Sequence, residues 1–183
     1  MDDGTPDLER LRRLNAPFLG GTDALPKYEG AGFVVGIGSP AARLSLATKA
    51  RRAGLHEVVV VHRHATIGED VELGRGTVVC AGARLTTNVR TGLHVHVNIN
   101  ATVAHDVTLA DYVTLNPQAA LSGEVSVKEA ATVGSAAVVR QGLSIGERAT
   151  VGAGAAVLRD IPSGETWVGV PARVLYPSSD GTD

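Results

Sequence analysis

A six-residue repeat of aliphatic side chains runs through the second half of the chain. Counting every sixth residue from Ile67 to Val157 gives sixteen positions, and fifteen of them are Ile, Leu or Val, with Thr91 as the exception. Four residues after each position stands a second, mostly small apolar residue, such as Ala101 or Ala119. The register holds without an insertion across the whole stretch. A repeat kept this strictly constrains the fold of the entire region.

A period of six fits neither an α-helix, which repeats every 3.6 residues, nor an alternating strand, which repeats every two. It is typical of short parallel strands joined by tight corners, three strands to a turn, with the large aliphatic side chains inside. The sequence therefore predicts a β fold: a left-handed parallel β-helix of a little over five coils, each of about eighteen residues. A β-sandwich would show irregular spacing and hairpin turns such as Asn-Gly, which the sequence lacks. The aromatic content of only 3% agrees with a core of identical small slots.

The region before the repeat predicts a small α/β unit. An apolar, β-branched run at Phe33–Ile37 indicates a strand. Ser39 is suited to cap the helix that follows, and Gly54 is a natural stop for it. A second buried strand is expected at Val58–Val61. Strand, helix and strand in this order imply a parallel pair, with too few strands for a complete doubly wound domain.

Three regions are therefore expected along the chain. Residues 1–61 form a truncated, Rossmann-like α/β unit that includes a short helix at Asp7–Leu14. Residues 62–176 form the β-helix domain, and residues 177–183 form a flexible tail.

Charge and cysteine content exclude several classes of function. The chain has 17 basic and 19 acidic residues, a net charge of −2 and no long basic cluster, which argues against binding to nucleic acids or anionic membranes. Cys80 is the only cysteine, so neither a disulfide framework nor a cysteine zinc cluster is expected, and Cys80 is expected to pack as a small hydrophobe. No stretch resembles a leader or a membrane span, which favours a cytoplasmic protein.

Stacking of the predicted coils gives one histidine an unusual environment. Residues eighteen apart lie in one column, so that Thr87, His105 and Gly123 follow one another at the spacing of parallel strands. A glycine over an imidazole leaves room for a ligand chain and bares a main-chain N–H that can stabilise an oxyanion. Asp106, the next residue, is placed to fix the tautomer of that imidazole. His105 with Asp106 is the leading catalytic candidate, and the alternative is a surface histidine without a task.

Other outward positions are weaker candidates. His94 and His96 lie two apart on one predicted strand and are expected to point outward, and Tyr112, one coil above His94, is a candidate wall for a groove. The two histidines resemble part of a metal site, but no third ligand has a suitable spacing, so surface or interface histidines are favoured. Thr114 is predicted to lie directly over His96.

Two further polar features stand near these columns. Asn98 and Asn116 are expected to stack as a polar pair. The strand-to-helix turn at Gly36-Ile37-Gly38 is suited to a phosphate at a helix N-terminus. The third glycine of the dinucleotide fingerprint is missing, so a tight turn with a helix cap is slightly favoured.

Motifs spread over nearly the whole chain resemble those of a known family. The segments Val97-Asn98 and Val103-Ala104-His105-Asp106 are similar to an Ile-Asn and Val-Glu-His-Asp signature. Residues 151–157, 160–164 and 168–172 are similar to a C-terminal closing motif. Together they resemble the hexapeptide acyltransferases of the sialic acid and bacillosamine type, which are acetyl-CoA-dependent sugar O- and N-acetyltransferases.

The resemblance implies an activity, an assembly and a set of site residues. It implies a homotrimer with its sites in the grooves between protomers, His105 as general base beside Asp106, and acetyl-CoA or another acyl-CoA as the donor, with no metal. The remaining contacts that it implies are Thr114, Gly123, Ser135 and Ala153 for the acyl-CoA, and Asn98, Gly38 and His96 for the acceptor.

Two departures from the family leave the acceptor open. The family's N-terminal strand with its Gly-Gly-His-Ala turn, which helps to bind a nucleotide, is missing; this fits a chain that begins late or a protein that uses no nucleotide-sugar. A family histidine that contacts the acyl donor is replaced by Thr114. The acceptor is therefore an amine or hydroxyl of a sugar or nucleotide-sugar, or alternatively of a small molecule in secondary metabolism. Two other classes stay open, namely a trimeric zinc enzyme of the carbonic anhydrase type and a non-catalytic β-helix scaffold.

Overall fold

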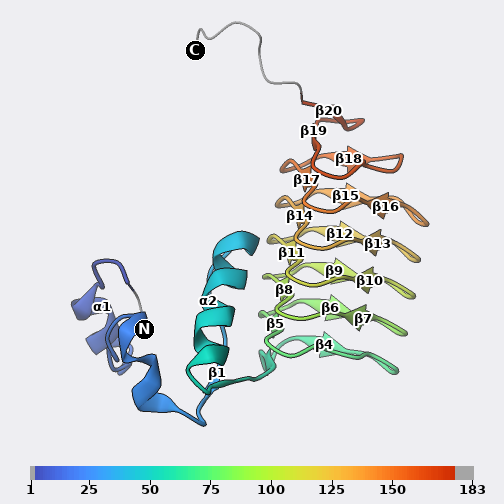
Figure 1. Ribbon diagram of the computed structural model, residues 1–183. Helices are drawn as coiled ribbons and strands as arrows, with labels where there is room; N and C mark the ends of the chain where they lie inside the picture. The colour runs from blue at the N-terminus through green and yellow to red at the C-terminus, as the bar shows by residue number, and fades with distance from the viewer. Residues whose placement is uncertain (1–2, 176–183) are drawn as a thin grey trace, which may run out of the picture.

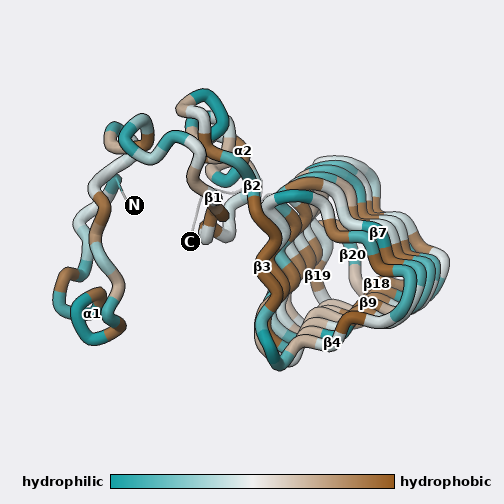
Figure 2. The backbone as a smooth tube through the Cα atoms, turned by 90° about the horizontal axis from the view of Figure 1, so that it is seen from below, coloured by the Kyte–Doolittle hydropathy of each residue, from teal (hydrophilic) through white to brown (hydrophobic). Residues whose placement is uncertain are grey.

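The computed structural model describes residues 3–175, in which a tall parallel β-solenoid stands beside a small N-terminal unit (Figure 1). The tail expected over residues 177–183, and the last residue of the expected β-helix domain, lie outside the described residues. Seen along its axis, the solenoid is a stack of nearly superposed coils with the N-terminal unit attached at one side (Figure 2).

The solenoid is built from three sheets of very short strands, one sheet on each side of the coil. The eight-stranded sheet contains β3 (Val60–Val61), β5 (Val78–Val79), β8 (His96–Val97), β11 (Thr114–Leu115), β14 (Thr132–Val133), β17 (Thr150–Val151), β19 (Thr166–Val168) and β20 (Arg173–Val174). The six-stranded sheet contains β4 (Thr66–Ile67), β6 (Arg84–Leu85), β9 (Thr102–Val103), β12 (Ala120–Leu121), β15 (Val138–Val139) and β18 (Ala156–Val157). The four-stranded sheet contains β7 (Arg90–Thr91), β10 (Thr108–Leu109), β13 (Ser126–Val127) and β16 (Ser144–Ile145).

The pairing of these strands follows the repeat. From β3 to β18 each strand pairs in parallel with the strand eighteen residues away, as Thr114 does with His96 and Thr132. β17 pairs in parallel with β19 at a spacing of sixteen residues, and among the described strands only β20 pairs antiparallel, with β19. The repeat itself fills a little over five coils, as expected. The strand β3 before it and β19 after it extend the solenoid to about six turns.

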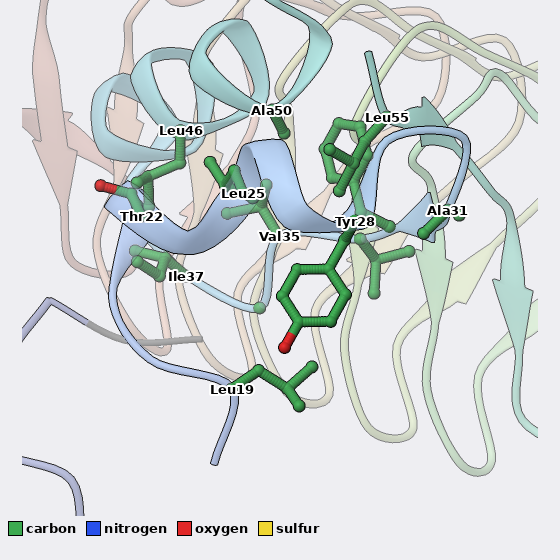
Figure 3. Close-up of a pocket in the computed structure, with 14 residues that line it drawn as sticks. Leu19, Thr22, Leu25, Tyr28, Ala31, Val35, Ile37, Leu46, Ala50 and Leu55 are labelled. Atoms are coloured by element: carbon green, nitrogen blue, oxygen red, sulfur yellow. The ribbon is translucent and has the colours of Figure 1, made fainter. Parts of the chain in front are cut away.

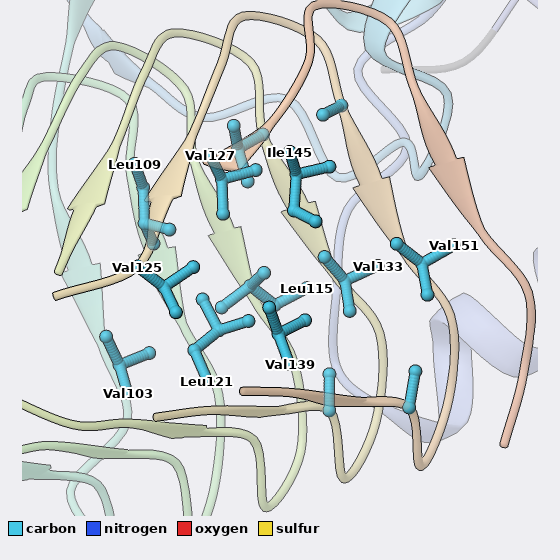
Figure 4. Close-up of a cluster of buried hydrophobic side chains, with 14 of the residues drawn as sticks. Val103, Leu109, Leu115, Leu121, Val125, Val127, Val133, Val139, Ile145 and Val151 are labelled. Carbon is cyan, nitrogen blue, oxygen red and sulfur yellow. The ribbon is translucent and has the colours of Figure 1, made fainter. Parts of the chain in front are cut away.

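The aliphatic positions of the repeat from Leu73 onward form one continuous core inside the solenoid (Figure 4), whereas Ile67, in the first coil, is 37% exposed. Leu115, Val133 and Val151 are examples with at most 1% of their surface exposed. The exception, Thr91, also points inward, and its hydroxyl accepts a hydrogen bond from the Gly74 main chain at 2.9 Å. A polar side chain is tolerated at this half-buried position because its hydroxyl has a hydrogen-bond partner.

The N-terminal unit contains five elements in the order helix, 3-10 helix, strand, helix, strand. These are α1 (Leu8–Arg13), η1 (Thr22–Tyr28), β1 (Gly32–Phe33), α2 (Pro40–Arg52) and β2 (His56–Glu57). The strands β1 and β2 pair in parallel with α2 between them, which confirms the expected strand–helix–strand order. The Ser39 hydroxyl caps α2, as predicted. No helix among residues 3–175 is long and apolar enough to cross a membrane.

Two strand predictions in this unit are wrong in detail. The first strand covers only Gly32–Phe33 rather than Phe33–Ile37. The segment Val58–Val61 is not a buried strand of the α/β unit: Val60–Val61 is β3, the first strand of the solenoid, and both side chains are about 40% exposed. The apolar run misled because it starts a new sheet, with its pairing partner Val78 eighteen residues ahead.

Candidate functional site

His105 and Asp106 lie in the turn between β9 and β10, where the chain passes from the six-stranded to the four-stranded sheet. Asp106 has a left-handed φ of 62° at this corner. The Nδ1 atom of His105 and Oδ2 of Asp106 are 2.7 Å apart, and about half of each side chain is exposed. The expected contact is therefore present. A proton on Nδ1 leaves the Nε2 lone pair free to accept another.

Gly123 lies over His105, as the eighteen-residue spacing predicts. The space left by its missing side chain, however, is not free for a ligand as expected. A Cβ on Gly123 would lie 2.4 Å from Cε1 and 2.5 Å from Nε2 of His105. The imidazole itself fills the place of the missing side chain, so the glycine accommodates the histidine rather than a ligand chain. A residue with a side chain at position 123 would displace the ring.

Two residues missed by sequence reasoning complete this corner. The Asn88 side-chain amide donates to Oδ1 of Asp106 from the coil below. Glu124 lies in the coil above, and a carboxylate oxygen of Glu124 is within 4.8 Å of ligand atoms of both His105 and Asp106. The eighteen-residue spacing that placed Gly123 over His105 also relates Asn88 and Glu124 to Asp106, so the signal was available in the sequence. We call this group, His105 with Asp106, Gly123, Asn88 and Glu124, the open corner.

Electrostatics at the open corner keep Asp106 ionised. The hydrogen bond from His105 and then that from Asn88 lower the pKa of the Asp106 carboxyl below its ordinary value. A carboxylate accepts hydrogen bonds only, which favours the tautomer of His105 with its proton on Nδ1. The arrangement suits a histidine that acts as a general base through Nε2.

The residues expected at the acyl donor and the acceptor do not all gather at this corner. Ser135 and Ala153 are exposed and lie one coil apart, in turns between the eight-stranded and six-stranded sheets. Asn98 lies in the same kind of turn, two coils below Ser135 and three coils below Ala153. Asn98 donates its side-chain amide to the Leu115 carbonyl. A full side of the solenoid separates these turns from His105. Within this chain the predicted site is therefore divided between two edges of the solenoid.

His94, His96 and Tyr112 stand at outward positions, as predicted, but the prediction that they lie on an accessible surface is wrong. All three point away from the solenoid core, yet the N-terminal unit covers them, and they are 0%, 7% and 5% exposed. The rings of His94 and Tyr112 stack at 5.4 Å, and Nε2 of His94 is 3.5 Å from the Glu57 carboxylate. Tyr112 is thus an internal packing residue rather than the wall of a groove.

Burial also changes the protonation of these histidines. Desolvation, followed by the charge of Arg43, lowers the pKa of His96 to about 4. Desolvation likewise lowers the pKa of His94, although Glu57 acts in the opposite direction. Both rings are neutral near pH 7. Burial raises the pKa of the half-buried Cys80 thiol, whose Sγ lies 4.0 Å from Oδ1 of Asn98.

Thr114 and Gly38, expected at the donor and the acceptor, meet each other under the N-terminal unit. Thr114 is 1% exposed, and its hydroxyl donates to the Gly38 carbonyl at 3.2 Å. Arg43 of α2 in turn donates to the Thr114 hydroxyl at 3.0 Å. We call His94, His96, Tyr112, Thr114 and Arg43 the covered edge. The hydroxyl of Thr114 is engaged within the chain, and His96 pairs with Thr114 in the sheet beneath it.

Metal-ligating side chains are distributed differently from the expectation. His94 and His96 lie at the covered edge and His105 at the open corner, so these three histidines do not share a site. Among the described residues, the one group whose ligand atoms lie close enough for a metal is His105 with Asp106 and Glu124. Nδ1 of His105 and both oxygens of Asp106 already have hydrogen-bond partners in this group.

An apolar cavity of about 370 Å³ lies within the N-terminal unit, between η1, α2 and the segment that follows β1 (Figure 3). Leu19, Leu25, Tyr28 and Leu46 are among its lining residues. The lining contains no histidine, carboxylate or amine, so this cavity offers no acid–base chemistry of its own. It does not include His105 or Asp106.

Comparisons with solved structures show strong similarity over most of the chain. A point mutant of a perosamine N-acetyltransferase from Caulobacter crescentus, in complex with CoA and GDP-perosamine, is 35% identical with a TM-score of 0.87, covering 90% of this chain and 80% of that one. The acetyltransferase domain of PglB from Neisseria gonorrhoeae, in complex with acetyl coenzyme A, is 31% identical with a TM-score of 0.84, covering 96% and 84%. WeeI from Acinetobacter baumannii is 32% identical with a TM-score of 0.79, covering 96% and 80%.

No protein-family model matches the sequence, and neither does any curated protein. The solved structures are decisive because identity above 30% extends over most of both chains. They confirm the left-handed β-helix and the family resemblance seen in the motifs. The chain is an acyltransferase that belongs to the hexapeptide-repeat sugar acetyltransferases of the left-handed β-helix fold.

Proposed function

We propose that this protein transfers an acetyl group from acetyl-CoA to an amine of a sugar, carried by a nucleotide or free. The observation that carries the proposal is the His105–Asp106 pair, held at 2.7 Å beneath Gly123. The similar structures support the chemistry: the perosamine enzyme is an N-acetyltransferase found with CoA and GDP-perosamine, and the PglB domain was found with acetyl coenzyme A. An amine acceptor is favoured over a hydroxyl because the named activity of the first relative is N-acetylation.

In the proposed mechanism, His105 acts as the general base. The acceptor nitrogen attacks the thioester carbonyl carbon while Nε2 of His105 takes a proton from that nitrogen. Asp106 holds Nδ1–H and stabilises the imidazolium that forms. A main-chain amide at the Gly123 turn stabilises the tetrahedral oxyanion. Collapse of the intermediate breaks the carbon–sulfur bond, and the imidazolium of His105 then gives the proton that it took from the acceptor nitrogen to the CoA thiolate.

We further propose a homotrimer in which each site lies between two protomers. In one chain, His105 is at the open corner, whereas Ser135 and Ala153 lie at the other end of the six-stranded sheet. Packing of flat solenoid faces around a threefold axis would bring one protomer's open corner to its neighbour's donor turns. Acetyl-CoA then lies along the groove past Ser135 and Ala153 towards His105, and Asn98 helps to hold the acceptor. The single cysteine agrees with a cytoplasmic location.

Acceptor chemistry tests the proposed function. Purified protein is given acetyl-CoA with a nucleotide-linked amino sugar, the matching nucleotide-linked sugar with a hydroxyl in place of the amine, or a simple alkyl amine. Thiol release and the mass of the product are measured. We expect thiol release and an acetylated product with the amino sugar only. Release with the hydroxyl sugar at the same rate would contradict N-transfer, and release with the alkyl amine alone would identify a small-molecule acceptor.

Mixing of two inactive variants tests the shared site. His105→Ala removes the base, and Ala153→Trp places a bulky ring in the proposed donor groove. If each site uses His105 from one protomer and Ala153 from another, trimers reassembled from the two variants regain activity. If both residues serve a site within one protomer, the mixture stays inactive. A molar mass of one chain in solution would contradict the trimer directly.

A separate experiment tests whether the open corner binds a metal ion that the reaction needs. Metal analysis of the purified protein and turnover after chelation distinguish the acyltransferase from the alternative metalloenzyme. We expect unchanged thiol release after chelation. Loss of turnover that added zinc restores would favour the metal-dependent reading of His105, Asp106 and Glu124.

A further inference from the structure

Arg43 is a completely buried arginine whose side chain crosses from α2 to the solenoid. Nε donates to the His94 carbonyl at 2.9 Å, and one terminal nitrogen donates to the carbonyls of Tyr112 and Val113. His94 and Tyr112 are eighteen residues apart, so the guanidinium bridges two successive coils. No carboxylate pairs with Arg43 among the residues that the structure describes. Desolvation lowers the pKa of Arg43 to about 10, and it stays charged at pH 7.

The same guanidinium also holds the strand-to-helix loop that precedes α2. Its other terminal nitrogen donates to the Ile37 carbonyl at 2.9 Å and to the Gly38 carbonyl at 3.1 Å. Thr114 donates its hydroxyl to the same Gly38 carbonyl and accepts from Arg43. One buried cation and one buried hydroxyl thus fasten two consecutive loop carbonyls to the coil that contains β11. Buried charge-assisted hydrogen bonds of this kind are the strong ones.

The outer face of that loop is open. A Cβ on Gly38 would meet no heavy atom within 4 Å, and the same holds for Gly36, which borders the apolar cavity of the N-terminal unit; neither residue has a left-handed φ. Their lack of side chains therefore serves neither internal packing nor backbone conformation. In a trans peptide the C=O and the N–H point in opposite directions. The carbonyls of Ile37 and Gly38 are turned inward, so the N–H groups that share their peptide bonds, those of Gly38 and Ser39, are turned outward.

We infer that Thr114, together with Arg43, is a positioning residue for the acceptor: the two side chains fix the Gly36–Ser39 loop to the solenoid so that its open face is held in one place for the acceptor molecule. The inference rests on the proposed function only in naming the acceptor as the ligand affected. It gives Thr114 a role beneath the loop in place of contact with the acyl donor. The proposed donor groove past Ser135 and Ala153 lies along other turns, so we expect loss of the Thr114 hydroxyl to leave it unchanged.

The test compares Thr114→Val with Thr114→Ser. Valine keeps the shape of threonine and loses the hydroxyl, whereas serine keeps the hydroxyl. For Thr114→Val we expect the acceptor KM to rise about tenfold, the size of effect that one buried hydrogen bond gives, with kcat and the acetyl-CoA KM unchanged. Thr114→Ser restores the acceptor KM. Thr132→Val is the matched control, because Thr132 pairs with Thr114 in the same sheet one coil further on and lies outside the contacts of the loop.

A second readout needs no turnover. Hydrogen exchange of the peptide over residues 39–45 reports the first turn of α2, where the Arg43 amide donates to the Ser39 carbonyl. We expect faster exchange of this peptide in Thr114→Val and in Arg43→Lys than in the wild type, and unchanged exchange in Thr132→Val and in the solenoid strands. Arg43→Lys keeps the charge but loses the planar fork that reaches both sides.

The outcomes separate this inference from the proposed function. If the acceptor KM of Thr114→Val equals that of the wild type while His105→Ala is inactive, the inference fails and the proposed function stands. A rise in the acetyl-CoA KM of Thr114→Val, with an unchanged acceptor KM, would overturn the inference in favour of a donor contact. If exchange at residues 39–45 is faster in Thr114→Val but the wild-type protein acetylates no sugar, the loop is held by Thr114 as inferred and the proposed function is wrong.

Discussion

The histidines of the covered edge and of the open corner all stand at outward positions of the same repeat, yet they have opposite environments. His96 is 7% exposed, its pKa is lowered to about 4, and its Nε2 atom has no hydrogen-bond partner among residues 3–175. The His105 side chain is 48% exposed and contacts an ionised Asp106. The repeat dictates neither environment. The N-terminal unit covers one edge and leaves the other free, so it determines which histidine is available for acid–base chemistry.

The difference also separates stability from catalysis. Side chains of the covered edge are buried among rings and main-chain carbonyls, so we expect their loss to lower the free energy of unfolding. Side chains of the open corner contribute few buried contacts, so we expect their loss to lower turnover and to leave stability nearly unchanged.

The largest effect on stability is expected at the covered edge. Tyr112→Ala removes a ring that is 5% exposed and stacked on His94, and we expect the free energy of unfolding to fall by about 3 kcal/mol. Urea unfolding of the purified protein measures it. Lys128→Ala, at an exposed position of the solenoid, should change it by less than about 0.5 kcal/mol. Equal losses in the two variants would erase the distinction between the regions.

At the open corner, Gly123→Ala tests the space over His105. The added methyl group would meet the imidazole at 2.4 Å, and the ring must move to avoid it. A shift of about 1 Å in a catalytic group costs about a hundredfold in rate. We expect kcat to fall by about that factor, with the unfolding midpoint nearly unchanged. Wild-type kcat in this variant would show that the ring position observed here is not the one used in catalysis.

Asp106→Asn probes the partner of the imidazole. The amide keeps the size of the carboxyl group but loses the negative charge that stabilises the imidazolium, so we expect kcat to fall about tenfold. Acetyl-CoA binding, measured by thermal shift, should stay as in the wild type. A loss of acetyl-CoA affinity with unchanged kcat would assign Asp106 to the donor instead of the base.

The smallest expected effect is the dependence of stability on pH that the buried His96 of the covered edge causes. The pKa of His96 is about 4 in the folded protein against 6.5 for an ordinary histidine, so between these values the unfolded chain binds a proton that the folded chain does not. Stability is therefore full above about pH 6.5 and falls as the pH drops towards 4. His96→Gln should reduce this loss, as measured by urea unfolding at pH 7 and pH 5. His64→Gln, at an exposed turn, should leave the loss unchanged.

Much of this structure follows from the spacing of the sequence. The six-residue period gives the strands and the core, and its multiple of eighteen gives the columns, including Gly123 over His105 and Thr114 over His96. The same arithmetic reaches Asn88 and Glu124, which neighbour Asp106. These features are predictable because every coil repeats the geometry of the one before it.

The remaining features depend on contacts that no period encodes. The repeat distinguishes side chains that point inward from those that point outward. The residues that cover His94, His96 and Tyr112 belong to the N-terminal unit, which is far away in the sequence. The imidazole of His105 fills the space under Gly123 because of its own side-chain orientation. The contacts of Arg43 with the carbonyls of His94 and Tyr112 likewise follow from no spacing in the sequence.

The central claim is that His105 at the open corner, and no histidine of the covered edge, is the catalytic base. The most direct test is the kcat of His105→Ala with acetyl-CoA and the amino-sugar acceptor, measured together with acetyl-CoA binding. We expect kcat to fall by about two to four orders of magnitude, the usual contribution of a general base, while the protein still binds acetyl-CoA. A kcat within a few-fold of the wild type would contradict the claim.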